Sequence, residues 1–197
     1  MKVCKTMTKN QTLGISATLG GFLIATILLA WGQPLICTCG NVKLWVGSIW
    51  SSENSQQIAD WYTLSHFVHG LIIFPLGRLI FPKISFKSLC AVAILTGTGW
   101  EIIEHTDFVL DQFRATTINQ GYIGDSVLNA VSDYYFMLAG FFLASKLPSY
   151  VTLLLILVLE LTAALLVRDS LILETIMLVY PIEAIETWQQ QANPALR

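Results

Sequence analysis

The stretches WEIIEH, at residues 100–105, and GYIGDSVLNAVSD, at residues 121–133, place charged side chains inside otherwise apolar segments. The 197 residues are 54% hydrophobic and only 12% charged, about half the charged fraction of an average soluble domain. A soluble fold of this size could not bury so much apolar surface. We therefore expect an integral membrane protein with a single domain. The net charge of -2, without a long basic run, argues against nucleic acid as a partner.

Apolar stretches of about 20 residues, the length that crosses a bilayer as a helix, recur along the chain. They predict an all-α bundle of about five transmembrane helices surrounded by a lipid bilayer. The five spans are expected at residues 13–31, 61–81, 86–106, 124–146 and 150–167. Residues 32–60 are expected to form an outer loop, and residues 107–121 a shorter polar loop. Near the C-terminus, LILETIMLVYP at residues 171–181 is too short to span, and it predicts an interfacial helix.

Small residues are expected to let the predicted helices approach one another closely. Gly70 and Gly77 lie in the second span, and TGTG occupies residues 96–99 of the third. Inside a bilayer, close packing of this kind is a main source of helix association, because lipid tails are as apolar as leucine side chains.

The first span admits two interpretations, a retained helix and a cleaved signal peptide. Ala30, Trp31 and Gly32 match the small-x-small pattern of a cleavage site. The apolar core of the span is longer than the ~7–15 residues of a signal peptide, and this favours the retained helix.

Basic residues predict which end of the bundle faces the cytoplasm. Those on the side of the N-terminus are Lys2, Lys5, Lys9, Arg78, Lys83, Lys87 and Lys146. Those on the opposite side are Lys43, Arg114, Arg168 and Arg197. The larger group lies on the N-terminal side, so the positive-inside rule predicts a cytoplasmic N-terminus.

Three spans carry polar residues, most of them ionisable, near the end of the bundle opposite the N-terminus. Their spacings put each set on one helix face: His66 and His69 are three apart, Glu101 is three from Glu104 and four from His105, and Asp125, Asn129 and Asp133 follow at steps of four. A charged group that faces lipid costs about 3 kcal/mol, so the cluster is expected to face a shared cavity. We expect Glu160 to join it, and Arg114 or Arg168 to neutralise part of its charge.

Simpler roles are open for some of these residues. Asp125 follows Gly124 and is suited to cap the fourth helix. Asn129 is suited to a hydrogen bond between helices, and His105, close to the interface, is expected to be solvated.

Three functional hypotheses are open for the cluster, and the sequence does not decide whether the protein is an enzyme. The first is a metal- or acid/base-dependent activity on an envelope or lipid-linked substrate. Its divalent-metal ligands would be His66, His69, Glu101 and Glu104, and its catalytic acids and bases Glu101, Glu104, Asp125 and Asp133. The second is a small-solute or proton-coupled carrier, and the third a structural protein whose polar network fixes helix packing. No HExxH or paired ExxH pattern identifies a metal, and no organic cofactor is indicated.

The four cysteines form neither a CxxC pair nor a zinc-finger pattern. Cys37 and Cys39, in the segment CTCG, are the one suggestive pair. They are compatible with a soft-metal site, a short-loop disulfide, or two structural thiols, and the spacing favours the last of these.

Three motifs stand out: DWYTLSHFVHG at residues 60–70, WEIIE at 100–104 and GYIGDSVLN at 121–129. Together with CTCG at 37–40, they resemble a family of uncharacterised bacterial multi-pass inner-membrane proteins. The resemblance covers nearly the whole chain, and it implies a location in the cell inner (plasma) membrane. The family has no established activity, so the resemblance assigns no catalytic residue.

A more limited similarity is to VanZ-like membrane proteins of bacterial envelopes. The residues that carry it are His66, Phe67, a glutamate of the third span, Arg114, Asp125 and Asn129. The spacing from Arg114 to Asp125 is longer than in that pattern, and Ser132 stands in place of a glycine. The similarity implies an envelope or lipid-linked substrate.

Overall fold

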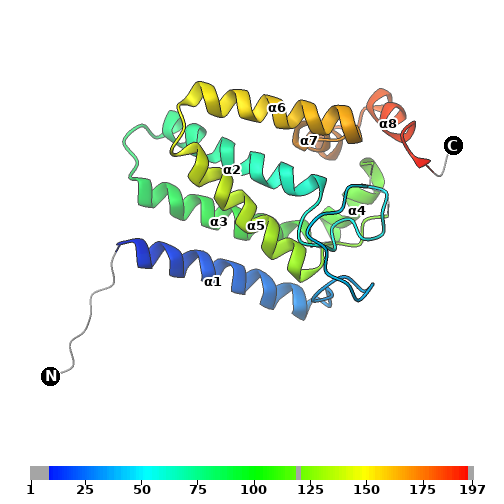
Figure 1. The fold of residues 1–197 in the computed structure, drawn as a ribbon, viewed down its shortest axis with the longest axis horizontal. Helices are drawn as coiled ribbons and strands as arrows, with labels where there is room; N and C mark the ends of the chain where they lie inside the picture. Colours follow the sequence, from blue (N-terminus) through cyan, green and yellow to red (C-terminus); the bar gives the residue numbers. More distant parts are fainter. Residues whose placement is uncertain (1–8, 119–120, 195–197) are drawn as a thin grey trace.

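The computed structural model describes residues 9–118 and 121–194, which form helices and connecting turns without any strand (Figure 1). Five helices are long and apolar enough to cross a membrane: α1 (Lys9–Ala30), α2 (Trp61–Ile80), α3 (Phe86–Glu104), α5 (Val127–Ala144) and α6 (Ser149–Val167). The shorter helices are α4 (Asp107–Thr116), α7 (Leu171–Val179) and α8 (Glu183–Gln190). The expected all-α class, with five helices of spanning length, is confirmed.

Two segments differ from the expected pattern. The prediction of a polar loop over residues 107–121 is wrong in part, because α4 occupies most of that range and buries Val109, Leu110 and Phe113. At the C-terminus, two short helices stand where one was expected. Pro181 lies between them, and its ring prevents α7 from continuing into α8.

Helices α2 and α5 touch backbone to backbone at two glycines. A Cβ atom added to Gly70 of α2 would collide with the carbonyl oxygen of Met137, and one added to Gly140 of α5 would collide with that of Phe67. The expected close contact at Gly70 is therefore present, and its partner is α5. The prediction for TGTG holds for Gly97, which packs against Met137, but a Cβ at Gly99 would meet no atom within 4 Å.

Helix α1 packs against α3 and α5 and contributes to the main core. Its Ile24 and Leu28 are completely buried. The hydroxyl of Tyr134 on α5 donates a hydrogen bond to the carbonyl oxygen of Ala17, at 3.1 Å. This packing makes α1 an integral part of the bundle. Cys4 and the basic residues Lys2, Lys5 and Arg197, which enter the orientation prediction, lie outside the described residues.

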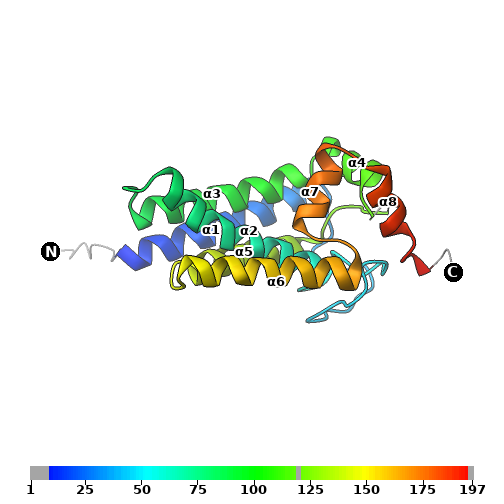
Figure 2. The same cartoon turned by 90° about the horizontal axis from the view of Figure 1, so that it is seen from above.

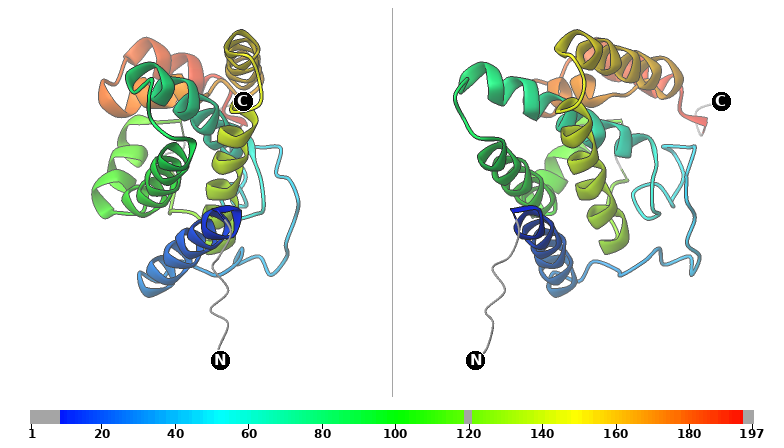
Figure 3. Two further views of the ribbon diagram at one scale, coloured as in Figure 1. Left: turned by 90° about the vertical axis from the view of Figure 1, so that its left-hand side faces the viewer. Right: turned by 60° about the vertical axis from the view of Figure 1, so that its left-hand side comes forward.

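Most of the chain outside the five long helices lies at one end of the bundle. The C-terminal ends of α1, α3 and α6 and the N-terminal ends of α2 and α5 meet there, on the right in Figure 1. The long loop after α1 and the short helices α4, α7 and α8 gather at the same end, as Figure 2 also shows. Helix α6 lies at the edge of the bundle beside α2 (Figure 3), and many of its leucines are exposed.

Candidate functional site

A cavity of about 270 Å³ lies at this end of the bundle, where α2, α3 and α5 meet α4 and α7. Its polar lining consists of Ser55, Tyr62, Ser65, His66, His69, Glu104, Tyr122, Asp125, Asp133, Glu174 and Thr175. Its apolar lining consists of Trp100, Phe113, Leu171, Leu178 and Val179. These lining residues include four carboxylates and no lysine or arginine.

His66 lies between two carboxylates, each from a different helix. Its Nδ1 atom is 3.3 Å from Oε1 of Glu101 on α3, and its Nε2 atom is 3.9 Å from Oδ2 of Asp133 on α5. All three side chains are buried. The close approach of α2 and α5 at Gly70 holds His66 next to Asp133. Glu101 does not line the cavity, so His66 connects a carboxylate in the cavity wall with one outside it.

A second pair of carboxylates shares one tyrosine hydroxyl. Tyr122 Oη lies 2.8 Å from Oδ1 of Asp125 and 3.2 Å from Oε1 of Glu104. The hydroxyl has one hydrogen, so it donates to one carboxylate and can accept from the other only when that carboxyl is protonated. Burial raises the pKa of Asp125 and also that of Tyr122, and this favours a proton held within the group.

His105 closes the end of α3 and is fully occupied by backbone groups. Its Nδ1 atom lies 2.7 Å from the carbonyl oxygen of Glu101, and its Nε2 atom accepts a hydrogen bond from the N–H of Asp125, at 2.9 Å. Both bonds are satisfied together only by the neutral tautomer with hydrogen on Nδ1. The expectation that His105 is solvated is wrong, because this pairing lets the ring be buried.

Residues at the start of α2, outside the cavity lining, bond to residues that line the cavity. Asp60 caps α2: its carboxylate accepts hydrogen bonds from the N–H groups of Ser55, at 2.7 Å, and Tyr62, at 2.8 Å. Burial raises the pKa of Asp60 to about 6, although these hydrogen bonds act in the opposite direction. The cap of α5 is Ser126, so the suggestion that Asp125 fills that role is wrong.

Asn129 joins α5 to the long loop. Its amide donates to the carbonyl oxygen of Gln57, at 2.8 Å. A hydrogen bond by Asn129 was expected, but between two helices, and its actual partner lies in the loop.

Helix α7 supplies a wall of the cavity that the sequence did not reveal. Its Glu174 lines the cavity and is half-buried, and burial and the nearby charge of Asp169 hold its pKa well above the usual range. Across the cavity, the ring of His69 lies edge-on to Trp100, with 5.8 Å between ring centroids. Among the described residues, the ring nitrogens of His69 have no hydrogen-bond partner.

Three predicted members of the cluster lie elsewhere. Glu160 accepts hydrogen bonds from the N–H groups of Leu171 and Ile172, so it caps the first turn of α7 together with Ser170, the N-cap residue of that helix. Arg114 bonds to the carbonyl oxygen of Tyr122 and to Asp111. Arg168 packs on the ring of Trp188 and bonds to its carbonyl oxygen. Neither arginine neutralises the cluster, since each is held by these other partners.

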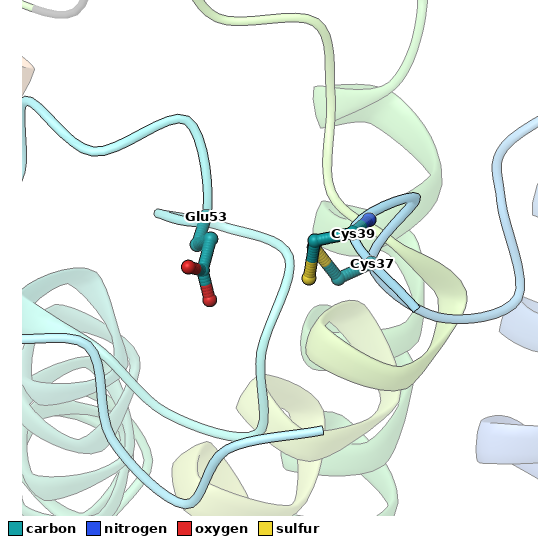
Figure 4. A group of neighbouring side chains, drawn as sticks. All are labelled: Cys37, Cys39 and Glu53. Carbon is teal, nitrogen blue, oxygen red and sulfur yellow. A yellow bond between two sulfur atoms is a disulfide. The ribbon is translucent and has the colours of Figure 1, made fainter. Parts of the chain in front are cut away.

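In the part of the chain that the structure describes, two groups bring three metal-binding atoms within 4.8 Å of one another. The first is Glu101, His105 and Asp125, but the lone pair of His105 Nε2 already accepts the N–H of Asp125. The second is Cys37, Cys39 and Glu53, in the long loop (Figure 4). Cys37 and Cys39 are joined by a disulfide, which leaves no thiolate to bind a metal. His66, His69 and Glu104 belong to neither group.

The fold and the site together define an all-helical protein with five helices of membrane-spanning length and a buried histidine–carboxylate cluster at one end. The apolar helices indicate a lipid bilayer as its environment. The chain belongs to the family described as "Protein of unknown function (DUF2585)", which matches residues 28–191. The match begins near the end of α1 and includes every later helix.

Similar proteins carry the name UPF0314 protein. The one from Paracoccus denitrificans (strain Pd 1222) is 45% identical over 174 residues, which is 88% of this chain and 90% of that protein. The one from Sphingopyxis alaskensis is 46% identical over 167 residues, 85% of this chain and 89% of that protein. The resemblance to an uncharacterised family is thus confirmed. No solved structure matches the chain.

Proposed function

We propose that this protein carries a membrane-embedded acid/base site that exchanges protons with a polar ligand bound in the cavity. The observation that carries the proposal is the position of His66, which presents one ring nitrogen to Glu101 and the other to Asp133. A neutral imidazole has one donor and one acceptor nitrogen, so it can take up a proton on one side and release one on the other. This geometry suits proton transfer, because metal ligands would instead converge on a single point.

The residues divide into two roles under this proposal. Asp133 and Glu104 line the cavity, and each has one carboxylate oxygen without a hydrogen-bond partner among the described residues. They are the candidates for direct acid/base work on the ligand. Glu101, outside the cavity wall, would exchange a proton with Asp133 through His66, and Asp125 would act together with Glu104 through Tyr122.

The charge of the cavity selects against anions. Its lining includes four carboxyl groups and no lysine or arginine, so a phosphate would find no permanently charged counter-ion there. An uncharged hydroxyl-rich group or an amine fits this lining better. The apolar wall formed by Leu171, Leu178 and Val179 suits a hydrocarbon portion, which supports an envelope or lipid-linked substrate. With the N-terminus in the cytoplasm, the site would lie in the outer leaflet of the inner membrane.

Selective labelling of histidine tests the proposal directly, because the chain has only three histidines. We would record nitrogen NMR spectra of the detergent-solubilised protein across pH and assign His66 with a His66→Gln variant. Both Glu101→Gln and Asp133→Asn should alter the tautomer balance and the nitrogen shifts of His66. The matched control Asp111→Asn, at an exposed site, should leave them unchanged. Identical His66 spectra in all four proteins would contradict the proposal.

Ligand class is tested separately by thermal shift. A panel of uncharged sugars and polyols, amines and phosphates would be added to the wild type and to Asp133→Asn. The proposal expects stabilisation by an uncharged or amine compound that is lost in Asp133→Asn. Stabilisation by phosphates alone would contradict it.

A divalent metal is the second candidate, and it rests on the unpartnered oxygens of Glu101, Glu104 and Asp133 in a cavity whose lining has no lysine or arginine. The ligands would be His66, His69, Glu101 and Glu104, after a rearrangement that brings their atoms together. Elemental analysis of protein purified with added zinc, iron or manganese separates the candidates. One equivalent of metal that is lost in both Glu101→Gln and His69→Ala would favour the metal over proton exchange alone.

A further inference from the structure

The disulfide between Cys37 and Cys39 lies in the long loop (Figure 4), and that loop lies at the same end of the bundle as the cavity (Figure 1). Only one residue separates the two cysteines, so the bond closes a very small ring and joins no distant parts of the chain. In the chain-entropy account, stabilisation by a disulfide grows with the length of the loop it closes. A bond that spans one residue therefore does little to stabilise the fold, and this leaves a chemical role open.

The two sulfur atoms are not equivalent. Cys37 is 4% exposed, whereas Cys39 is exposed. The backbone N–H of Cys39 donates a hydrogen bond to Sγ of Cys37, at 3.2 Å. A thiolate from outside can therefore reach Cys39, and the hydrogen bond stabilises negative charge on Cys37 as it leaves. Both factors, access and a stabilised leaving group, accelerate thiol–disulfide exchange.

The polar surroundings hold the sulfur atoms in place. The side-chain amide of Gln57 lies 3.4 Å from Sγ of Cys39 and also donates to Glu53, at 3.0 Å. Glu53 in turn pairs with Lys43, at 2.7 Å. The site thus combines one exposed cysteine with a network of polar side chains around it.

We propose that Cys37 and Cys39 form a thiol–disulfide exchange site whose partner is a dithiol, and that Cys39 is the sulfur attacked. A thiolate of the partner bonds to Sγ of Cys39, and the bond between Cys39 and Cys37 breaks with Cys37 leaving as the thiolate. The second thiol of the partner then attacks its own sulfur in the mixed disulfide and releases Cys39. The protein gains two electrons and two protons, and the dithiol becomes a disulfide. This proposal is independent of the acid/base proposal.

The first test uses full-length protein in which Cys4 and Cys90 are replaced by serine. Oxidised protein is incubated with a dithiol, either dithiothreitol or reduced thioredoxin, under native conditions, and free thiols are counted by maleimide labelling and intact mass. We expect reduction of the Cys37–Cys39 bond without loss of fold, and re-oxidation when a disulfide is supplied. A bond that only unfolded protein loses would overturn the proposal.

The second test separates the two sulfur atoms. In the same serine background, the single-cysteine variants Cys37→Ser and Cys39→Ser are mixed with oxidised glutathione. The remaining Cys39 should form the mixed disulfide roughly tenfold faster than the remaining Cys37, because Cys39 is exposed and Cys37 is buried, and access limits the rate. Equal rates would overturn the assignment of Cys39. Stoichiometric zinc bound by the reduced wild type, and lost in Glu53→Gln, would indicate a metal site and overturn the exchange site.

Discussion

Gly70 of α2 and Gly140 of α5 lie at the same helix crossing, each against the backbone of the opposite helix. Gly70 is one turn from His66, and Gly140 is two turns from Asp133, so this contact sets how closely His66 and Asp133 can approach. The crossing therefore connects the packing of the bundle with the geometry of the candidate site.

We expect Gly70→Ala to lower the free energy of unfolding by about 1–3 kcal/mol, because the new methyl group collides with the rigid backbone at Met137. The control Gly99→Ala adds the same group to α3 with no atom within 4 Å, and alanine in a helix is favoured over glycine by up to ~1 kcal/mol. Gly99→Ala should thus be neutral or stabilising. Thermal denaturation in detergent measures both, and a destabilisation of equal size would contradict the close crossing.

Glu101→Gln separates a proton-exchange role from a packing role. Glutamine has the shape of a protonated glutamate, so it should keep the contact with His66 and change stability by less than about 1 kcal/mol. The nitrogen shifts of His66 should nevertheless change. If Glu101→Gln destabilises the protein as much as Glu101→Ala does and leaves the His66 spectrum unaltered, the cluster is a packing network.

Asp169 should make stability depend on pH. Its carboxylate is buried and accepts hydrogen bonds from Tyr62 and Gln189, and burial raises its pKa to about 7. Because the unfolded pKa is about 3.9, the folded state binds more protons between these values. The contribution of Asp169 is therefore complete below pH 4 and is lost as pH rises to 7, by at most about 1.4 kcal/mol per pH unit.

Asp169→Asn should flatten that part of the stability profile, measured by denaturation at a series of pH values between 4 and 8. The control Asp111→Asn, at an exposed pair with Arg114, should keep the slope of the wild type. A profile for Asp169→Asn with the original slope would assign the pH dependence to another group, such as Asp60, whose pKa is about 6.

Glu160→Ala should loosen α7 from the cavity. The carboxylate of Glu160 holds the first N–H groups of α7, and the loss of such a cap costs about 0.5–2 kcal/mol. Hydrogen exchange should accelerate in α7, including the segment around Glu174. Thr162→Val, which removes an exposed hydroxyl bonded within α6 itself, serves as the control. Unchanged protection of α7 in Glu160→Ala would contradict the capping role.

The sequence was sufficient to predict the spanning helices and the level of the cluster. Long apolar runs identify the helices, and the positions of His66, Glu101 and Asp133 within those runs place them near one end. Periodicity within one helix says nothing about which neighbour a side chain meets. For this reason the positions of Glu160, Arg114 and Arg168 were predicted incorrectly.

Tyr122 and Glu174 were missed for different physical reasons. Tyr122 lies in an irregular segment before α5, where no periodicity applies. Glu174 belongs to a nine-residue helix, and so short a segment does not predict that it forms a wall of the site. Glu174 is nevertheless the single charged residue in LILETIMLVYP. The burial of His105 depends on a bond to Asp125, twenty residues away, which a pattern of nearby residues cannot show.

Gln57 links the disulfide of the long loop to the helix that carries part of the acid/base site. Its side chain contacts Cys39, while its carbonyl oxygen holds Asn129, one turn from both Asp125 and Asp133 on the same chain. A movement of Gln57 on reduction of the disulfide would be passed through this hydrogen bond to α5, the helix that carries Asp133 of the cavity lining. If the oxidation state of the loop changes the affinity of the cavity for a ligand, thermodynamic reciprocity requires that the ligand shifts the redox equilibrium of the disulfide by the same free energy.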